Sequence, residues 1–577
     1  MSDQTRGVIF VVLVIAVTFI WMHFFQPPAP PPQKPGQSVG QTVPGQTPGA
    51  GPAQPSPGTG VAQPAASAQG VVANIPVVQA TAEKNMVVES SLYRVELSNH
   101  GAVVRSWKLK NYFDDQKPPR PLDLVNPDSA QELGWPLSLM LSDPQLEARA
   151  NSALYDITPG LENLTAPAEI TFHWSDGHLD VTKRLKFTQD YQMSIEVSAS
   201  LDGRPLAPAI AWRGGFGDKA VYKASQLLTV FYKQSDSLTL LQYKKLGVSG
   251  NQIQPFEQSG PLQFAGMMDQ FFTAAFIPDG SDLSLWHWTQ WHHYTTPDNQ
   301  PAADPAAEIA VGAASAGPLK ARMYVGPKDL ALLARVQPSL EGLINFGWFG
   351  IISKALLFAL QWLHRYIPNW GWAIVVLTLV INTAVFPLKM KSWRSMQEMQ
   401  KIAPEMRQIQ DKYKKYSMTD PRKKGMQEEM LALQQRHGIS PLASVSGCLP
   451  MLLQMPIWWA LWRVLTGAIE LRHAAFVFWI HDLSVRDPFY ILPIAMAITM
   501  YVSMSMTPQS AAIDPAQQKM MRFMPLTFAA IFFTYASGLN LYMLTSNLVG
   551  VGQQYYLNRT RPLPSNSPFK NKKKKQQ

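Results

Sequence analysis

Arg463 is the residue whose type and position most require a chemical explanation. It lies within Leu449–Ile469, an apolar segment long enough to cross a bilayer, since about 20 apolar residues suffice. A central arginine in a spanning helix costs roughly 2.5–3.5 kcal/mol, so it normally faces a bundle interior or a wet cavity. There its guanidinium could bind acidic groups. The alternative is that the side chain snorkels to the outer interface, about 9 Å away.

Polar side chains in the neighbouring apolar segments could line the same cavity. Thr378 and Asn382 lie in one segment, Gln454 precedes Arg463 in another, and the last segment carries Asn547. Ordinary hydrogen bonding between helices explains threonine and serine well, at under about 1 kcal/mol each. It explains arginine poorly, because a guanidinium needs counter-charge or water. The pattern therefore favours a hydrated groove, and helix-to-helix contact remains the second interpretation.

The apolar segments belong to a multi-pass α-helical membrane protein with six spans and a large all-β domain, according to length and composition. The predicted order is a signal-anchor span at 1–25, a disordered Pro/Gly-rich linker at 26–83, a β-sandwich domain at 84–337, an interfacial amphipathic helix at 346–367, a second span at 372–388, a basic helical hairpin at 389–441, further spans at 447–469, 489–506, 523–537 and 539–557, and a basic tail at 558–577.

The β domain is predicted from short runs rich in β-branched and aromatic residues. Glu169–Trp174 and Asp180–Phe187 flank Asp176-Gly177, which is a hairpin signal. The region shows no metal-ligand spacing, nucleophile elbow or phosphate loop, so we expect no enzyme activity, cofactor, metal or small-molecule substrate. Sandwiches of this size can bind sugars, which leaves a lectin or epimerase role as an outside interpretation.

Positive charge is concentrated beside the apolar segments. Lys389–His437 holds twelve Lys and Arg against six Asp and Glu, and the tail holds seven Lys and Arg with no acid. By the positive-inside rule both regions are cytoplasmic, and so are both termini. The basic tail residues are Arg559, Arg561, Lys570, Lys572, Lys573, Lys574 and Lys575.

The basic hairpin carries methionines at intervals of three and four residues, as one helix face requires. Flexible thioethers adapt to varied apolar partners, so these side chains could receive client segments. A plain antiparallel coiled pair is the equal alternative. The candidate client contacts are Met396, Met399, Met406, Met426 and Met430.

Several sequence blocks resemble the YidC family of bacterial membrane protein insertases. They are Gly447–Pro450, Gln454–Ile457, Glu470–Arg472, Trp479–Leu483, Asp487–Pro488, Tyr490–Pro493, Asp514–Met520, Phe523–Pro525, Ser537–Leu539 and Ser546–Leu548. The resemblance is close over about Phe346–Arg559, and covers the rest in layout only. It implies a periplasmic β-supersandwich, a five-helix insertase core in the inner membrane, and a groove open to cytoplasm and lipid. It also implies nascent membrane proteins, the Sec translocon, the ribosome and membrane lipids as partners, with no enzymatic turnover.

This sequence departs from the family pattern at one position. The pattern has an arginine in the second span, where this chain has Asn382, while Thr378 matches a family groove threonine. Tyr542 matches a family tyrosine, and the neighbouring tyrosine position holds Met543. We therefore expect Arg463 to replace the missing groove cation. The groove residues that the spacing and the resemblance together predict are Thr378, Asn382, Gln454, Met455, Trp459, Arg463, Tyr542, Met543 and Asn547.

Two other classes of protein remain as alternatives. A small-solute channel or transporter would show internal repeats and paired broken helices, and the spans show no repeat. A membrane-tethered carbohydrate-binding protein or enzyme would work through the β domain.

Overall fold

The structure is a computed structural model that describes residues 75–219, 227–242, 255–280, 282–295, 300–313, 316–413, 416, 423–438, 449–506 and 531–560. Four predicted segments lie outside these residues in whole or in large part. They are the first span, the linker, the span at 523–537, and the tail beyond Thr560.

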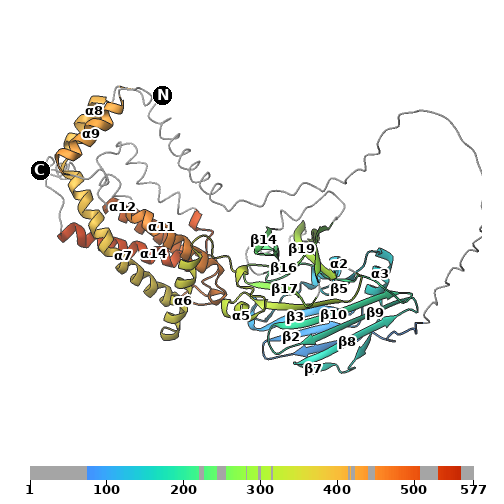
Figure 1. The fold of residues 1–577 in the computed structure, drawn as a ribbon. Coiled ribbons are helices and arrows are strands. Elements are labelled where there is room, and N and C mark those ends of the chain that lie inside the picture. The colour runs from blue at the N-terminus through green and yellow to red at the C-terminus, as the bar shows by residue number, and fades with distance from the viewer. Residues whose placement is uncertain are drawn as a thin grey trace, which may run out of the picture. The chain divides into compact units, whose positions relative to one another are not determined.

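Three β-sheets form the domain that follows the linker (Figure 1). The first contains β1 (Asn85–Glu89), β2 (Tyr93–Ser98), β3 (Val103–Phe113), β4 (Pro121–Asp123) and β7 (Asn163–Thr165). The second contains β6 (Asp156–Thr158), β8 (Ala168–Ser175), β9 (Leu179–Phe187), β10 (Gln192–Leu201), β11 (Arg204–Pro205), β13 (Thr229–Gln234), β14 (Ser237–Gln242), β16 (Leu262–Met268), β17 (Phe272–Pro278) and β20 (Leu319–Pro327). The third contains β5 (Ser138–Met140), β12 (Ala209–Trp212), β15 (Phe256–Gln258), β18 (Leu283–Thr295) and β19 (Pro301–Ala313).

The side chains of the central strands of the second sheet alternate between buried and more exposed positions, as expected for strands with one face on the core. In β9 every second side chain from Leu179 to Phe187 is buried, and β9 pairs antiparallel with both β8 and β10. The turn between β8 and β9 contains Gly177 at φ +93°, a backbone conformation that side chains with a Cβ rarely adopt. The predicted hairpin and the predicted β-sandwich domain are confirmed.

Lys183 occupies a core-facing position of β9 and is buried. Its ammonium donates hydrogen bonds to the backbone carbonyls of Gly101, Ala102 and Leu137, at 2.8, 3.1 and 2.9 Å. These three acceptors match the three donors of an ammonium group, which is the condition for tolerating a buried charge.

The remaining described elements are mainly helical. Within or just after the β domain they are α2 (Pro127–Leu133), α3 (Pro144–Ser152), α5 (Leu330–Arg335) and the 3₁₀ helix η2 (Glu341–Leu343). Beyond it they are α6 (Gly350–Tyr366), α7 (Trp370–Lys401), α8 (Ala403–Tyr413), α9 (Lys423–Arg436), α11 (Leu449–Gly467), η3 (Ile469–Leu471), α12 (Ile491–Met506) and α14 (Ser537–Thr560).

Length and composition single out one of the described helices as able to cross a membrane, namely α7, over Trp370–Met399. The shorter α12 is also apolar. The six spans predicted from the sequence are therefore not confirmed. α7 also continues past Leu388, the predicted end of the second span, so the span and the start of the predicted hairpin form one helix.

α6 buries Ser353, Leu357 and Leu360 against the protein and leaves other apolar side chains exposed on its outer side. Ser353 is buried and donates to the carbonyl of Phe346, and Gln361 donates to Glu470 Oε1 at 2.6 Å. On the other side, Ile351 and Phe358 are 89% and 57% exposed. An exposed apolar face of this kind is typical of a helix that lies in a membrane interface.

The segment after α11 makes buried contacts with the β domain. The guanidinium of Arg472 pairs with Asp218 at 2.6 Å, and the two side chains are 4% and 2% exposed. Arg472 also donates to the carbonyl of Phe113 and lies over the ring of Phe272. Gln270 adds a hydrogen bond to the carbonyl of Thr466, so the Gly467 end of α11 contacts the β domain.

Candidate functional site

α7 and α14 run parallel in a fixed register. Ile374 lies beside Gly538, Asn382 bonds Ser546, and Lys389 bonds Gln553, and in each pair the residue numbers differ by 164. Gly538 also permits the close approach of Leu483, because a Cβ there would lie 3.1 Å from the Leu483 carbonyl oxygen. Layers of paired residues therefore repeat after eight and then seven positions along both helices.

Asn382 is the centre of a polar cluster between these helices. Its side chain is buried, and its amide nitrogen donates to Ser546 Oγ at 3.2 Å and to the carbonyl of Thr378 at 3.0 Å. Gln553 donates to the backbone carbonyl of Asn382 at 3.2 Å. Thr378 is also buried, and its hydroxyl donates to the carbonyl of Ile374 within α7. These bonds satisfy polar groups that would otherwise be costly to bury.

Lys389 brings a positive charge to this cluster. Its ammonium donates to Asn382 Oδ1 at 3.1 Å and to Gln553 Oε1 at 3.3 Å. Residues seven apart lie on the same face of a helix about 10 Å apart, and helical side chains lean toward the N-terminus. The lysine side chain therefore extends back along α7 to reach the asparagine.

α11 contributes a third wall. Gln454 donates to Ser546 Oγ at 3.4 Å, and Tyr542, four residues before Ser546 on α14, is buried. The polar cluster is defined here as Thr378, Asn382, Lys389, Gln454, Tyr542, Ser546 and Gln553.

Arg463 does not reach the polar cluster. It is nine residues beyond Gln454 on α11, which places it about 13 Å further along the axis and half a turn around it. Its guanidinium lies over the ring of Trp462, 5.0 Å from the centroid, and it borders Gly347. Arg463, expected to replace the missing groove cation, therefore lies away from Asn382. A hydrogen bond sets Gln454, not Arg463, level with Ser546.

The other predicted groove residues lie around the cluster rather than in it. Met455 follows Gln454 and is half-buried, and Trp459 packs edge-on against Trp462. The sulfur of Met543 accepts from the indole of Trp458 at 3.1 Å. Asn547 turns away from α7 and donates to the carbonyl of Met496 in α12, at 3.5 Å.

The hairpin methionines divide into two groups. Met399 and Met406 are buried against Ile402 and Leu433, inside the pair formed by α8, α9 and the end of α7. In this arrangement both side chains lie in a seam between helices, which the same three-to-four spacing also marks, and their contact with clients stays a prediction. Met426 and Met430 are half-buried. The side chain of Met396 lies outside the described residues.

Of the predicted tail residues, Arg559 is described and is exposed near the end of α14. The six others, from Arg561 to Lys575, lie beyond the described residues.

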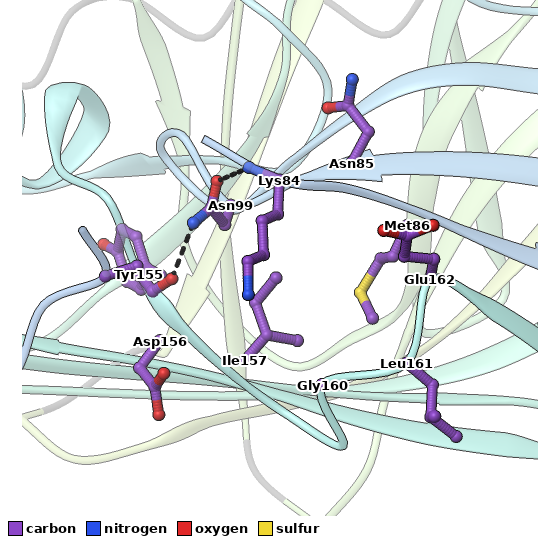
Figure 2. A pocket seen from close by; sticks show the side chains of 11 residues that line it. Lys84, Asn85, Met86, Asn99, Tyr155, Asp156, Ile157, Gly160, Leu161 and Glu162 are labelled. Carbon is purple, nitrogen blue, oxygen red and sulfur yellow. Dashed lines mark hydrogen bonds between the residues drawn. The ribbon is translucent and has the colours of Figure 1, made fainter. Parts of the chain in front are cut away.

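The two cavities found in the β domain differ in size. Figure 2 shows the smaller, of about 50 Å³, where Asn99 accepts from the backbone N–H of Lys84 and donates to the carbonyl of Tyr155. This space is far below the few hundred Å³ of a typical ligand site. The larger, of about 660 Å³, is lined by residues that include Asp128, Lys219 and His292. Within the described ranges, no group of three metal-ligating side chains was found.

Sequence reasoning missed Lys389, Ser546 and Gln553. Lys389 was interpreted only as a marker of the cytoplasmic side. On α14 the predicted groove residue was Asn547, whereas the residue that bonds Asn382 is Ser546, one position earlier, and Gln553 lies seven positions after Ser546. The available signal was the spacing of seven that relates Lys389 to Asn382 and Gln553 to Ser546.

Comparisons with known proteins cover both halves of the chain. A family model described as "60Kd inner membrane protein" matches residues 362–564, and one described as "YidC periplasmic domain" matches residues 85–359. The "Membrane protein insertase YidC" of Wolinella succinogenes is 32% identical over 501 residues, which cover 85% of each chain. That of Syntrophobacter fumaroxidans is 32% identical over 596 residues, covering 96% of this chain and all of the relative.

A solved structure described as "Active YidC insertase crystal structure with the first transmembrane domain resolved" is similar at 17% identity and a TM-score of 0.33. It covers 84% of this chain, and 96% of its own length is matched. The sequence relatives, which extend over nearly the whole chain, decide the assignment. This chain belongs to the YidC family of membrane protein insertases.

Proposed function

We propose that this insertase passes the polar part of a client along the polar cluster between α7, α11 and α14. The observation that carries the proposal is the bonded set of Asn382, Ser546, Gln454 and Lys389 inside otherwise apolar helices. Such side chains lower the cost of bringing a client's polar groups into the bilayer.

The client's apolar helix then moves into lipid past exposed apolar side chains. Leu379 and Val380 are exposed on α7, and Ile494 and Ile498 are exposed on α12. Because Leu379 and Val380 lie between Thr378 and Asn382 in sequence, one movement serves both parts of the client. The hydrated groove predicted from the sequence is part of this proposal.

The remaining features of the prediction complete the proposal. The chain crosses the inner membrane six times with both termini in the cytoplasm, and α6 contacts membrane lipids. Met426 and Met430 contact clients on the cytoplasmic side. The basic tail binds the ribosome, because lysine and arginine neutralise phosphate charge, and some clients arrive with the Sec translocon.

Site-specific photocrosslinking to a stalled nascent membrane protein tests the route. A photoreactive residue at Asn382 or at Met455 should crosslink to the client, and one at Arg463 on the opposite face of α11 should give only background. Equal yields from all three positions would contradict a route along the cluster.

Deleting Lys84–Gln337 separates the insertase from a carbohydrate enzyme or binding protein that works through the β domain. Insertion should survive the deletion if the membrane helices do the work. Abolition of all activity would favour the β-domain alternative.

A further inference from the structure

The larger cavity of the β domain has the size of a ligand site, and the proposed client route does not use it. Its volume of about 660 Å³ lies within the range of a few hundred to about 1,000 Å³ that is typical of small-molecule sites. Residues 214–219, with the sequence GGFGDK, form one wall of it. α2 contributes Asp128, β18 contributes Tyr294 and β19 contributes Asp304. Segments far apart in the sequence therefore converge on this space.

Hydrogen bonds and close packing fix the path of the glycine-rich wall. The N–H of Gly214 donates to Glu308 Oε1 at 2.8 Å. The indole N–H of Trp212 donates to the carbonyl of Gly215 at 2.9 Å. Gly214 has φ +73°, and a Cβ there would lie 2.7 Å from the Cα of Ala130, so no other residue fits. The backbone of this wall is therefore held in place by the β domain itself.

Two successive backbone N–H groups of this wall are left without a partner. Gly215 and Phe216 are buried and line the cavity, and neither N–H has an acceptor among the described residues. A buried N–H without a partner is rare, because it costs about as much free energy as a lost hydrogen bond. The side chain of Lys219 lines the same cavity. Successive N–H groups in a turn, together with a lysine, are groups that bind the oxygens of a phosphate.

Two carboxylates lie near the Lys219 ammonium. Burial lowers the pKa of Lys219, and the charges of Asp128 and Asp304 act against that lowering. Asp218 also lines the cavity, but Arg472 neutralises it at 2.6 Å. A lone anion in the cavity would be repelled by Asp128 and Asp304, and a lone cation would be repelled by Lys219. The charges therefore suit a ligand that carries both signs.

An aromatic wall supports the cationic end of such a ligand. The rings of His292 and Tyr294 stack with their centroids 5.8 Å apart, and Tyr294 is 40% exposed. Asp304 pairs with His292 across β18 and β19, so a carboxylate lies beside these rings. An open aromatic face attracts a cation, and a carboxylate beside it adds a charge-assisted hydrogen bond.

We propose that this cavity binds a phosphoethanolamine group, which is a phosphate ester with a primary ammonium on a short chain. The phosphate oxygens accept from the N–H groups of Gly215 and Phe216 and from the ammonium of Lys219. The ligand's ammonium donates to the carboxylates of Asp128 and Asp304. A lipid headgroup and a soluble ester share this chemistry.

Calorimetric titration of the full chain in lipid-free detergent micelles tests the ligand class, with glycerophosphoethanolamine as the probe. The chain should bind the probe. Ethanolamine and inorganic phosphate each supply one of its two charged ends, and each should bind at least about tenfold more weakly. If inorganic phosphate binds as tightly as the probe, recognition of both charges is wrong. No binding of the probe at millimolar concentration would overturn the proposal.

Variants that remove one charge locate the binding site. Lys219→Gln and Asp128→Asn should each weaken probe binding about tenfold, the effect of losing one charge-assisted hydrogen bond. Lys320→Gln and Asp236→Asn remove the same charges from exposed positions outside the cavity, and should leave the affinity unchanged. An affinity in Lys219→Gln equal to that of the unaltered chain would show that the probe does not bind in this cavity.

Nanodiscs distinguish the two sources of the ligand. The full chain is placed in discs of phosphatidylglycerol, with or without phosphatidylethanolamine, and each preparation is titrated with the soluble probe. Weaker probe binding in discs that contain phosphatidylethanolamine assigns the cavity to a lipid headgroup, because the lipid competes. Equal binding in both discs assigns it to soluble esters, and either result supports recognition of the phosphoethanolamine group. These titrations contain no client, so their failure would leave the proposed client route untouched.

Discussion

The β domain and the membrane helices each hold a lysine that points inward, and they hold it differently. Lys183 is surrounded by three backbone carbonyls, whose positions are set by the sheets and the loops between them. Lys389 has two partners, and both are rotatable side-chain amides. All three N–H donors of the Lys183 ammonium are hydrogen-bonded, whereas the Lys389 ammonium uses two of its three.

This difference separates a structural cation from one that can meet the polar part of a client. Burial lowers the pKa of Lys183 to about 7, because removal from water disfavours the charged ammonium. A site with every donor occupied cannot accept a ligand without breaking a bond. Lys389 can bond a polar group of the client while it keeps both amide bonds, and side-chain amides can adjust as a client passes.

The largest expected effect is on the structural cation. Lys183→Met should lower the unfolding free energy of the β domain by about 4 kcal/mol, because three buried carbonyls lose their donor. Lys186→Met, at an exposed position on the same strand, should change it by less than about 0.5 kcal/mol. Denaturant unfolding of the purified chain measures both. A small loss in Lys183→Met would show that water can replace the ammonium, and the contrast with Lys389 would weaken.

Glu308 is a second buried polar group of the β domain, and it should make the free energy of unfolding depend on pH. Burial raises the pKa of Glu308 to about 7, although the backbone N–H of Gly214 donates to it at 2.8 Å. The folded chain therefore binds a proton that the unfolded chain releases near pH 4.5. The unfolding free energy should fall by about 3 kcal/mol as the pH rises from about 4.5 to about 7.

Glu308→Gln removes that titration and is the direct check. Unfolding curves of the variant across the same pH range should be flatter than those of the unaltered chain. If the variant and the unaltered chain show the same pH dependence of unfolding, Glu308 is accessible to water. Polar groups shielded from water would then not be a general property of this domain.

The third effect concerns the amide that positions Lys389. Asn382→Leu removes its nearer acceptor, so the ammonium should extend toward water and the insertion of an acidic client should slow about fivefold. Thr383→Leu is the matched control, because that exposed hydroxyl bonds only within its own helix, to Leu379. Insertion assays with clients that differ only by Asp or Asn in the translocated segment measure both. Equal rates for the two variants would separate Asn382 from client recognition.

The smallest effect is expected for Lys389→Arg. A guanidinium keeps the positive charge and has donors enough for both amides and a carboxylate. Insertion of the acidic client should therefore stay within about twofold of the unaltered chain. A loss as large as that of Asn382→Leu would mean that the shape of the ammonium, rather than its charge, is what the client meets.

Sequence patterns identified local elements and missed the pairing between distant helices. Alternation of apolar residues and the Asp176-Gly177 turn predicted the hairpin of β8 and β9, since both signals are local. Periodicity also marked polar positions on α14. It could not say which face meets α7, because that depends on the register between helices far apart in the sequence.

The same limit applies to the predictions for Arg463 and for the methionines Met399 and Met406. Arg463 was expected to replace the groove cation, whereas Gln454, nine residues earlier on α11, is the residue that bonds to the cluster. The spacing of Met399 and Met406 fits a client-binding face and fits the contact face of a helix pair equally well. In the structure the two side chains are buried between helices. Lys183 was unpredictable for a related reason, since its acceptors come from loops outside its own strand.

The contact between Arg472 and Asp218 complicates any truncation experiment. Removing Lys84–Gln337 also removes Asp218, Phe113 and Phe272, which together bury the guanidinium of Arg472. It exposes Ile469 as well, which is part of the β-domain core. The shortened chain would therefore carry a newly solvated arginine and a bare apolar residue at the end of α11. A truncation with Arg472→Gln and Ile469→Thr is the version whose phenotype can be attributed to the missing domain alone.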